Sequence, residues 1–481
     1  MTNHQSNLSL PYKSESESKS ESRSVTFSIV SLGCPKNLVD SEYYVREMCE
    51  QGYKFLVEPD GCDVVVLNTC GFLQSARDEA RDYISGLVEM KNSGRIKRII
   101  VRGCMTQHEG KSKLAAEFPD VDEWHGIPSF RGQKVNLNNA INLPISQDVL
   151  VADSEQAAQV AVFGLGSSGF GREILTYDHV AYLRIADGCS RGCSFCTIPS
   201  IRGRYRSEAL GDLLFEAKEL AARGVKELIV IAQETTFWGM DLPERQRLVD
   251  LLRELETVDG IRWIRLMYAY PAFFDAELIS HFAQSEKLLP YIDIPLQHIN
   301  DTILQQMNRQ VTRKETELLL DNLRNEIKDV VLRTSFIVGF PGETDVMFDE
   351  LVKFVDKWRF ERAGVFAFSP EKGTPAANIK KQIPRRIINQ RLNRLKDTCA
   401  KQTAAYEKKQ KGTIINVQID NNFISEDGHI ESNLFVGRTY ADAPDIDPVV
   451  FVTSGKKLSG GEIVACEILE VDGSDLVGIA L

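Results

Sequence analysis

Short hydrophobic runs rich in β-branched residues alternate with amphipathic stretches in the first part of the chain. Between residues 25 and 162 the runs VTFSIVSL, DVVVLN and RIIVRG alternate with helical patterns such as SEYYVREMCEQG. Buried strands separated by amphipathic helices are typical of a parallel α/β sheet. The pattern therefore predicts a first domain over residues 25–162 with a parallel, Rossmann-like α/β fold.

A second alternation of strands and helices follows residues 163–175, a Gly/Ser-rich stretch that is predicted to be a linker. Between residues 176 and 411 six strand-like runs are separated by helical patterns: HVAYLRIADG, GVKELIVIAQ, IRWIRLMY, YIDIPLQ, VLRTSFIVGF and RAGVFAFS. Six such strands predict an open or closed parallel β/α barrel, a partial version of the TIM type. Its active site is expected at the carboxyl ends of the strands.

The pattern differs again at the two ends of the chain. Residues 1–24 are rich in Ser, Glu and Lys without apolar periodicity, so they cannot offset the entropy of ordering and are predicted to be a disordered tail. A Lys/Arg/Gln-rich helix is predicted over residues 387–411. Five short strand-like runs then fill residues 412–481, which predicts a small antiparallel β-barrel similar to an OB fold.

Length and composition narrow the class of protein. A chain of 481 residues is expected to form about three domains, and 43% hydrophobic with 26% charged residues is typical of soluble globular proteins. No apolar run is long enough for a membrane span, and the first residues do not resemble a signal peptide, so a cytoplasmic protein is expected. The net charge of -11 disfavours binding by phosphate neutralisation and suits a basic partner.

Three cysteines lie close together directly after the first strand of the predicted barrel. Cys189, Cys193 and Cys196 form a CxxxCxxC motif within ADGCSRGCSFCTIPSIRG. Three thiolates on one loop can bind three irons of a 4Fe-4S cluster and leave the fourth iron open to a cofactor with an amine and a carboxylate. A structural zinc site is the alternative, but zinc prefers four ligands and no fourth Cys or His is near. The spacing does not identify the organic cofactor.

A second set of three cysteines is spread along the first domain. Cys34, Cys70 and Cys104 each follow one of the predicted strands VTFSIVSL, DVVVLN and RIIVRG. Because the carboxyl ends of parallel strands meet at one edge of a sheet, these thiols are predicted to converge on a second cluster site. Three ordinary buried thiols are the alternative. The other four cysteines share no spacing and are expected to be core or surface thiols: Cys49, Cys62, Cys399 and Cys466.

These motifs resemble a known family. The CxxxCxxC motif with Phe195 before its last cysteine resembles the radical S-adenosylmethionine (SAM) superfamily. The runs SLGCPKNLVDSE, LNTCGF, RGCMTQ, YAYP, DIPLQH, FIVGFPGET and FSPEKGTPA resemble its methylthiotransferase branch from Val25 onward, and the last module is similar to a TRAM domain. Within that branch SIRG, AQETT and GRTYADAPDID resemble the enzymes that act on a ribosomal protein. Glu234 departs from this pattern, since an Asp is expected there.

The resemblance implies an enzyme that adds a methylthio group to the β-carbon of an aspartate in the twelfth small-subunit ribosomal protein. It implies that SAM on the Cys189/Cys193/Cys196 cluster yields a radical that abstracts hydrogen from this carbon, whose C-H bond offers no acidic proton. A second SAM would methylate sulfur at the other cluster. A reductant such as flavodoxin or ferredoxin is an implied partner, and no catalytic side chain is expected beyond the cluster ligands. A transfer-RNA adenosine methylthiotransferase and a non-catalytic electron carrier are the alternatives.

Two further groups are candidate SAM contacts. Ile337, Gly339 and Glu343 lie in IVGFPGE, which lacks the ending of a phosphate-binding loop; the resemblance implies a wall of the SAM site, and a simple turn is the alternative. Gln233 and Glu234 end a predicted barrel strand, where they suit the methionine or ribose part of SAM. Solvated loop residues are the alternative for this pair.

Charged residues are candidates for binding the substrate. Arg202, Arg204 and Arg206 form a basic loop beside the first motif that suits a substrate carboxylate, with a solvated surface as the alternative. His298 is expected to be an ordinary barrel residue. Residues 412–481 contain three basic and twelve acidic residues. This acidic excess is expected to repel phosphate and to attract a basic ribosomal protein. The alternative is that the charges only improve solubility.

Overall fold

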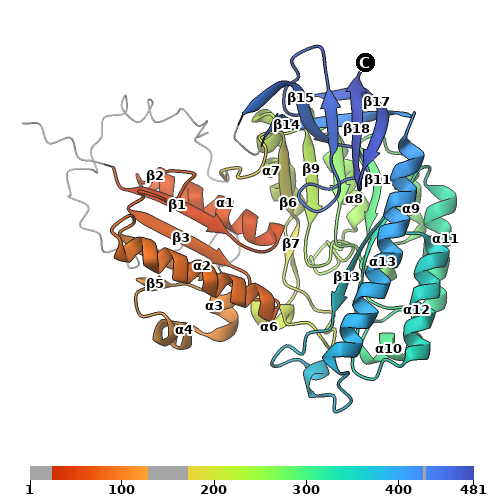
Figure 1. The fold of residues 1–481 in the computed structure, drawn as a ribbon, viewed down its shortest axis with the longest axis horizontal. Helices are drawn as coiled ribbons and strands as arrows, with labels where there is room; N and C mark the ends of the chain where they lie inside the picture. The colour runs from red at the N-terminus through yellow and green to blue at the C-terminus, as the bar shows by residue number, and fades with distance from the viewer. Residues whose placement is uncertain (1–23, 128–171, 426–428) are drawn as a thin grey trace, which may run out of the picture.

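The computed structural model describes residues 24–127, 172–425 and 429–481. Figure 1 shows an α/β unit (red and orange), a larger sheet covered by helices (yellow to light blue) and a small barrel at the C-terminal end (dark blue). The predicted tail up to residue 23, the linker up to residue 171 and the boundary at residue 162 lie outside the described residues. Among the described helices, none has the length and apolar composition that a membrane crossing requires.

The first unit is the predicted parallel α/β domain. Its five strands lie in the order β2-β1-β3-β4-β5 and all pairs are parallel. The three predicted strands are present, and two short edge strands join them. The strands are β1 (Thr26–Ser31), β2 (Lys54–Phe55), β3 (Val64–Thr69), β4 (Arg98–Gly103) and β5 (Glu123–Trp124).

Helices cover both faces of this sheet, which explains why β3 is hydrophobic along its length. Val64 and Val66 pack in one buried cluster with α1, whereas Val65 and Leu67 pack in another with α2 on the opposite face. The helices are α1 (Pro35–Glu50), α2 (Gln74–Asn92), α3 (Cys104–Glu109) and α4 (Lys111–Glu117). Because helices cover both faces of the sheet, the loops that follow the strands lie at its carboxyl edge and not over either face.

The second unit is an open sheet of six parallel strands in the order β13-β12-β11-β10-β9-β6, one of the two predicted forms. The strands are β6 (Val180–Arg184), β9 (Glu227–Ile231), β10 (Trp263–Leu266), β11 (Leu288–Asp293), β12 (Val331–Val338) and β13 (Arg362–Ala367). The covering helices are α7 (Leu210–Ala222), α8 (Leu248–Glu256), α9 (Ala276–Gln284), α11 (Arg313–Glu326) and α12 (Asp345–Trp358). Smaller elements are β7 (Ala186–Asp187), α6 (Ile198–Arg202), β8 (Arg206–Ser207), α10 (Asp301–Gln306) and the 3-10 turns at Pro271–Phe273 and Pro375–Asn378.

The inner face of the open sheet is packed by side chains from all three units. Tyr182, Ile231 and Tyr291 of the sheet share one buried cluster with Val39 of α1 and with Ala441 of the C-terminal module. The first domain and the C-terminal module thus complete a core that six strands leave open. The active-site face at the carboxyl ends of the strands remains turned toward the first domain.

The last 70 residues form a closed five-stranded barrel in the order β14-β15-β16-β18-β17, after the predicted long helix. All neighbouring pairs are antiparallel except β16 and β18, which are parallel. The prediction of an antiparallel barrel therefore holds with one exception, because an odd number of strands cannot alternate in direction around a closed barrel. The elements are α13 (Arg385–Gln410), β14 (Ile414–Ile424), β15 (Ile430–Arg438), β16 (Val450–Thr453), β17 (Ile463–Asp472) and β18 (Asp475–Ala480).

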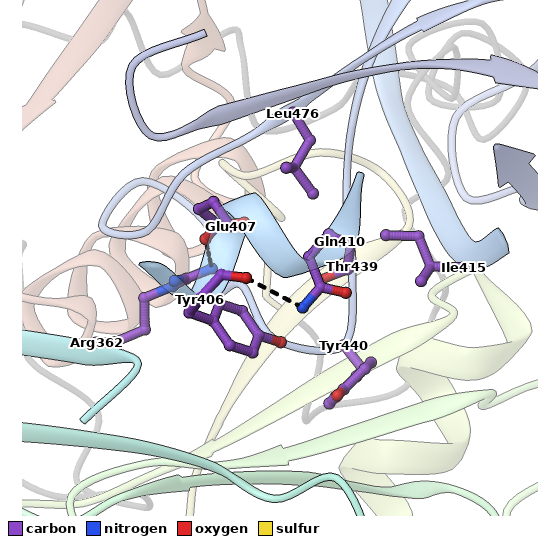
Figure 2. A pocket seen from close by; sticks show the side chains of 8 residues that line it. All are labelled: Arg362, Tyr406, Glu407, Gln410, Ile415, Thr439, Tyr440 and Leu476. Carbon is purple, nitrogen blue, oxygen red and sulfur yellow. Dashed lines mark hydrogen bonds and ion pairs between the residues drawn. The ribbon is translucent and has the colours of Figure 1, made fainter. Parts of the chain in front are cut away.

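Buried ion pairs attach this barrel to the amino-terminal ends of the sheet strands. Arg438 of β15 lies 2.9 Å from Glu227 of β9 and 2.7 Å from Asp420 of β14, and all three are buried. Arg362 of β13 pairs with Asp442 and, at 2.6 Å, with Glu407. Figure 2 shows a small cavity at this second contact, lined by Arg362, Tyr406, Glu407, Gln410, Ile415, Thr439, Tyr440 and Leu476. Two acidic side chains of the C-terminal module, Asp420 and Asp442, are thus buried in ion pairs and do not contribute to its surface charge.

The Arg438 pairs generate a stability prediction. Arg438→Met removes the cation that Glu227 and Asp420 share and leaves them with Arg265 and His179 alone, so the free energy of unfolding is expected to fall by about 3 kcal/mol. Chemical denaturation followed by circular dichroism measures this. Lys457→Met, at an exposed lysine of the same module, is the control and is expected to change stability by less than about 0.5 kcal/mol. Equal stability of the two variants would contradict the role of Arg438.

Candidate functional site

The structure brings the loops of Cys34, Cys70 and Cys104 together at the carboxyl edge of the first sheet. Cys34 precedes α1, Cys70 follows β3 and Cys104 begins α3 directly after β4. A Cβ atom on Gly33 would lie 2.7 Å from the Cβ of Cys70, and one on Gly71 would lie 2.5 Å from the carbonyl oxygen of Cys104. Only glycines allow these approaches, so the three loops are in direct contact.

The thiols of this set are poorly solvated. Burial raises the pKa of Cys104 to about 12; Arg202 acts in the opposite direction, and the neighbouring Cys34 and Cys70 thiols add to the rise. Burial also raises the pKa of Cys70. Ionised thiolates here need a nearby positive charge, which a metal centre supplies when it deprotonates its ligands. The donor set therefore fits a metal centre built on thiolates.

Within the described ranges, no three Cys, His, Asp or Glu side chains surround one point closely enough to hold a single metal ion.

The CxxxCxxC loop lies at the carboxyl ends of the open sheet. The short strand β7 and Gly188 separate β6 from Cys189, and the loop then runs into α6. The amide of Cys196 donates to the carbonyl of Cys193 at 3.1 Å, and the amide of Ile198 donates to the Cys196 sulfur at 3.4 Å. Burial raises the pKa of Cys189 to about 11 and that of Cys196 to about 12. These thiols, like those of the first set, are placed to bind a metal centre.

Arg202 connects the two cysteine sets. Its guanidinium donates to Asn37 Oδ1 at 2.6 Å and to Asp40 at 2.8 Å, both on α1, and lies 3.6 Å from the Cys104 sulfur. It also contacts Asp187, next to the CxxxCxxC loop, at 3.3 Å. Burial alone would raise the pKa of Asp40, but Arg202 and Arg184 hold it below its usual range.

These contacts correct the expectation for the basic loop. The side chain of Arg202 is 1% exposed and fully engaged, so it is neither a solvated surface group nor free for a substrate carboxylate. The sequence offered no sign of its partners, because Asn37 and Asp40 belong to another domain. Arg204 and Arg206 are exposed, as expected for a surface stretch.

Gln233 and Glu234 follow β9 beside the CxxxCxxC loop. Glu234 is buried and forms two charge-assisted hydrogen bonds with Arg191 of that loop, at 2.5 and 2.6 Å. Gln233 donates to Asp187 at 2.9 Å, while its Oε1 is buried without a hydrogen-bond partner in the described structure. Neither is a solvated loop residue. Both remain predicted SAM contacts, and Gln233 has an acceptor still available to a ligand.

The IVGFPGE loop is held by a buried network around Glu343. Its carboxylate accepts from the Gly339 amide at 2.6 Å and from Arg391 at 2.8 Å, and lies 3.2 Å from His298. His298 is therefore a satisfied buried residue, as expected. Ile337 packs in an apolar cluster that includes Phe195 of the CxxxCxxC loop. The loop thus lies beside that motif, and its contacts with SAM through Ile337, Gly339 and Glu343 stay a prediction.

Lys36 is a site residue that the sequence interpretation missed. It occupies the first turn of α1, two residues after Cys34, and is 5% exposed. Its ammonium lies 2.9 Å from the ring centroid of Tyr268, which follows β10. Burial lowers the pKa of Lys36 to about 7, against the opposing effects of Cys34 and Asp293. The signal available in the sequence was weak: a cation at a helix N-terminus, where the helix dipole disfavours it.

Three family models match successive parts of the chain. The radical SAM superfamily matches residues 183–355, the uncharacterized protein family UPF0004 matches residues 26–126 and the TRAM domain matches residues 412–481. The radical SAM methyltransferase TsrM from Kitasatospora setae gives a TM-score of 0.47 at 14% identity, over 74% of this chain and 77% of that one. A likeness at that level adds nothing to the assignment.

Curated relatives match nearly the whole chain. Ribosomal protein uS12 methylthiotransferase RimO of Thermoanaerobacter sp. (strain X514) is 38% identical over 94% of this chain and 98% of its own length. The proteins of the same name from Acetivibrio thermocellus and Lachnoclostridium phytofermentans are 39% and 40% identical, over 94% of this chain and 97% and 99% of their own lengths.

The open β/α sheet, its CxxxCxxC loop and these matches define a radical SAM transferase of the methylthiotransferase class. Membership of that superfamily implies a 4Fe-4S cluster and SAM. Within the class, the chain belongs to the family of the ribosomal protein uS12 methylthiotransferases RimO.

The contact between the Cys70 and Cys104 loops can be tested with glycine substitutions. Gly71→Ala would place a methyl group against the Cys104 carbonyl and is expected to lower the free energy of unfolding by about 1–3 kcal/mol. Gly86→Ala, in the exposed part of α2 where a Cβ meets nothing within 4 Å, is the matched control and is expected to raise it by up to about 1 kcal/mol. Denaturant unfolding is expected to show changes of opposite sign in the free energy of unfolding of the two variants. Equal changes would contradict the close approach of the Cys70 and Cys104 loops.

Proposed function

We propose that this chain methylthiolates the β-carbon of an aspartate side chain in ribosomal protein uS12. The relatives it matches along 94% of its length carry that protein in their name. The observation that carries the proposal is that Arg202 joins the CxxxCxxC loop to the three loops that carry Cys34, Cys70 and Cys104. A reaction that both activates carbon and inserts sulfur needs two such centres side by side.

Two 4Fe-4S clusters are part of this proposal. Cys189, Cys193 and Cys196 would hold the one that binds SAM, and Cys34, Cys70 and Cys104 would hold the second. The first supplies one-electron chemistry with SAM, which an unactivated C-H bond requires because its proton is too weakly acidic for a side-chain base.

The chain's own residues would position SAM and exclude water. Gln233 has its unpartnered Oε1 beside the CxxxCxxC loop, which suits the amine or a hydroxyl of SAM. Ile337 and Phe195 belong to one apolar cluster with Phe340 and Phe368, which would keep water from the wall of the site. Arg191 fixes the loop by pairing with Glu234 and lies 4.2 Å from the ring centroid of Phe273. No further side chain is needed as an acid or base.

The C-terminal barrel would dock the substrate. Asp420 and Asp442 are buried in ion pairs, but exposed acidic residues still outnumber the exposed Lys456 and Lys457 on the described part of the module: Glu431, Asp445, Glu462, Glu470 and Asp472. An acidic surface attracts a basic ribosomal protein and repels phosphate, which disfavours the transfer-RNA alternative. A flavodoxin or ferredoxin would serve as reductant, in the cytoplasm where ribosomes are assembled.

The choice of acceptor is tested by assay. Anaerobically reconstituted enzyme with SAM and reductant is expected to add sulfur plus a methyl group to uS12, as measured by mass spectrometry of its peptides. Transfer RNA incubated under the same conditions is expected to stay unmodified. Modification of transfer RNA alone would reject the proposal, and absence of 5'-deoxyadenosine would favour an electron carrier.

The second cluster is tested by iron analysis. Anaerobically purified wild-type protein is expected to contain about eight irons, and a variant with Cys34→Ala, Cys70→Ala and Cys104→Ala about four. A control with Cys49→Ala and Cys62→Ala, in the same domain but outside the set, is expected to keep about eight. Unchanged iron in the triple variant would remove the second cluster from the proposal.

A further inference from the structure

Lys36 is a buried amine with no carboxylate partner among the described residues. Across the part of the chain that the structure describes, its ammonium has no carboxylate within 4.0 Å; its close contact is the face of the Tyr268 ring, 2.9 Å from the centroid. A cation-π contact offsets only part of the cost of taking an ammonium out of water. The first turn of α1 adds to that cost, because the helix dipole is positive there.

The carboxylates around Lys36 are already neutralised by other groups. Asp293 accepts from Arg333 at 2.8 Å and from the Tyr268 amide at 3.0 Å. Asp187 accepts from Gln233 at 2.9 Å and pairs with Arg202 at 3.3 Å. Within the described residues, Lys36 therefore has no carboxylate of its own, since both neighbouring carboxylates are held by other groups.

The position of Lys36 relates it to both cysteine sets. It lies two residues after Cys34, and the ring beneath it belongs to Tyr268, at the carboxyl end of β10 in the sheet that carries the CxxxCxxC loop. Tyr268 has a φ of 60°, a left-handed conformation that costs energy in a bulky residue and is found where the surroundings impose it. The ammonium is thus held at the junction of the two domains, where a substrate would reach both centres.

We propose that the ammonium of Lys36 binds the side-chain carboxylate of the acceptor aspartate. This inference rests on the proposed function and adds the residue that selects the acceptor. The β-carbon of aspartate is bonded directly to its carboxylate carbon, so fixing the carboxylate also fixes the carbon that reacts. A buried ammonium without an anion favours an acidic acceptor over its amide, because only the acid restores neutrality.

A double-mutant cycle tests the contact. Lys36→Met is combined with uS12 in which the acceptor aspartate is replaced by asparagine, and the dissociation constants of the four pairs are measured by fluorescence anisotropy with loaded enzyme and SAM but no reductant. Wild-type enzyme is expected to prefer aspartate over asparagine by at least about 30-fold, as for a buried charge pair, and Lys36→Met to lose this preference. Lys36→Arg is expected to restore part of it.

Further measurements separate substrate binding from a structural role. Lys36→Met removes a buried charge that has no carboxylate partner in the described structure, so its melting temperature is expected to equal or exceed that of wild type, with unchanged iron content. Lys111→Met, an exposed lysine in the first turn of α4, is the matched control and should alter none of these values.

Two results would overturn the inference. One is an unchanged aspartate preference in Lys36→Met; the other is an equal loss of affinity for both acceptors together with a loss of iron, which would assign Lys36 to the neighbouring centre. If wild-type enzyme binds and modifies neither form of uS12, the proposed function fails as well. A modified uS12 with an intact preference in Lys36→Met would reject this inference alone.

Discussion

One buried guanidinium ties the CxxxCxxC loop to the three loops that carry the other cysteine set. Arg202 leaves the radical SAM domain at the end of α6 and pairs with Asn37 and Asp40 on α1 of the first domain. Without it, Asp40 would keep only Arg184, and the Cys104 sulfur would lose the cation beside it. Because each of these groups is buried, the pairs are hard to break without leaving an uncompensated charge. The relative position of the two candidate metal centres is thus fixed by charge as well as by packing.

Buried ion pairs also attach the first domain and the C-terminal barrel to the open sheet. Arg172 pairs with Glu42 of α1 and with Glu216 of α7, which secures the first domain to the sheet from the other side. At the opposite end, Arg438 and Arg362 secure the C-terminal barrel to the starts of the strands. The first domain and the C-terminal barrel therefore cover the inner face and the amino-terminal ends of the open sheet. The carboxyl ends of the strands are where the reaction is proposed to take place. This division agrees with the rule that β/α barrels carry function at one end and stability at the other.

Three features of the junction between the cysteine loops bear on ligand binding. In the described structure the Gln233 Oε1 is buried without a hydrogen-bond partner, Lys36 is buried with no carboxylate within 4.0 Å, and Tyr268 adopts a left-handed backbone conformation. Other buried polar atoms of the described chain also have no partner, for example in Gln402 and Gln418. The three at the junction matter here because each lies where SAM or the acceptor is proposed to bind.

The sequence by itself determined the elements and the places of the cysteines. The run DVVVLN became β3, because a strand buried on both faces needs apolar residues along its whole length, and the run VLRTSFIVGF became β12, in which buried and partly buried positions alternate over most of the strand. Cysteine spacing identified the CxxxCxxC loop, since its thiols are neighbours along the chain. The convergence of Cys34, Cys70 and Cys104 followed from strand order alone, because parallel strands end at the same edge.

Only the tertiary structure decided how the domains meet and which side chains remain unpaired. Arg202 looked like a surface residue because its partners Asn37 and Asp40 are about 160 residues away in the chain. The contacts of the Glu343 carboxylate with His298, Arg391 and the Gly339 amide could not be read from the sequence. Lys36 lies in the run SLGCPKNLVDSE, but the run did not show that the lysine is buried or that Asp187 and Asp293 are paired to other groups. Periodicity and spacing record local order, whereas the burial and pairing of a charge depend on which distant segments surround it.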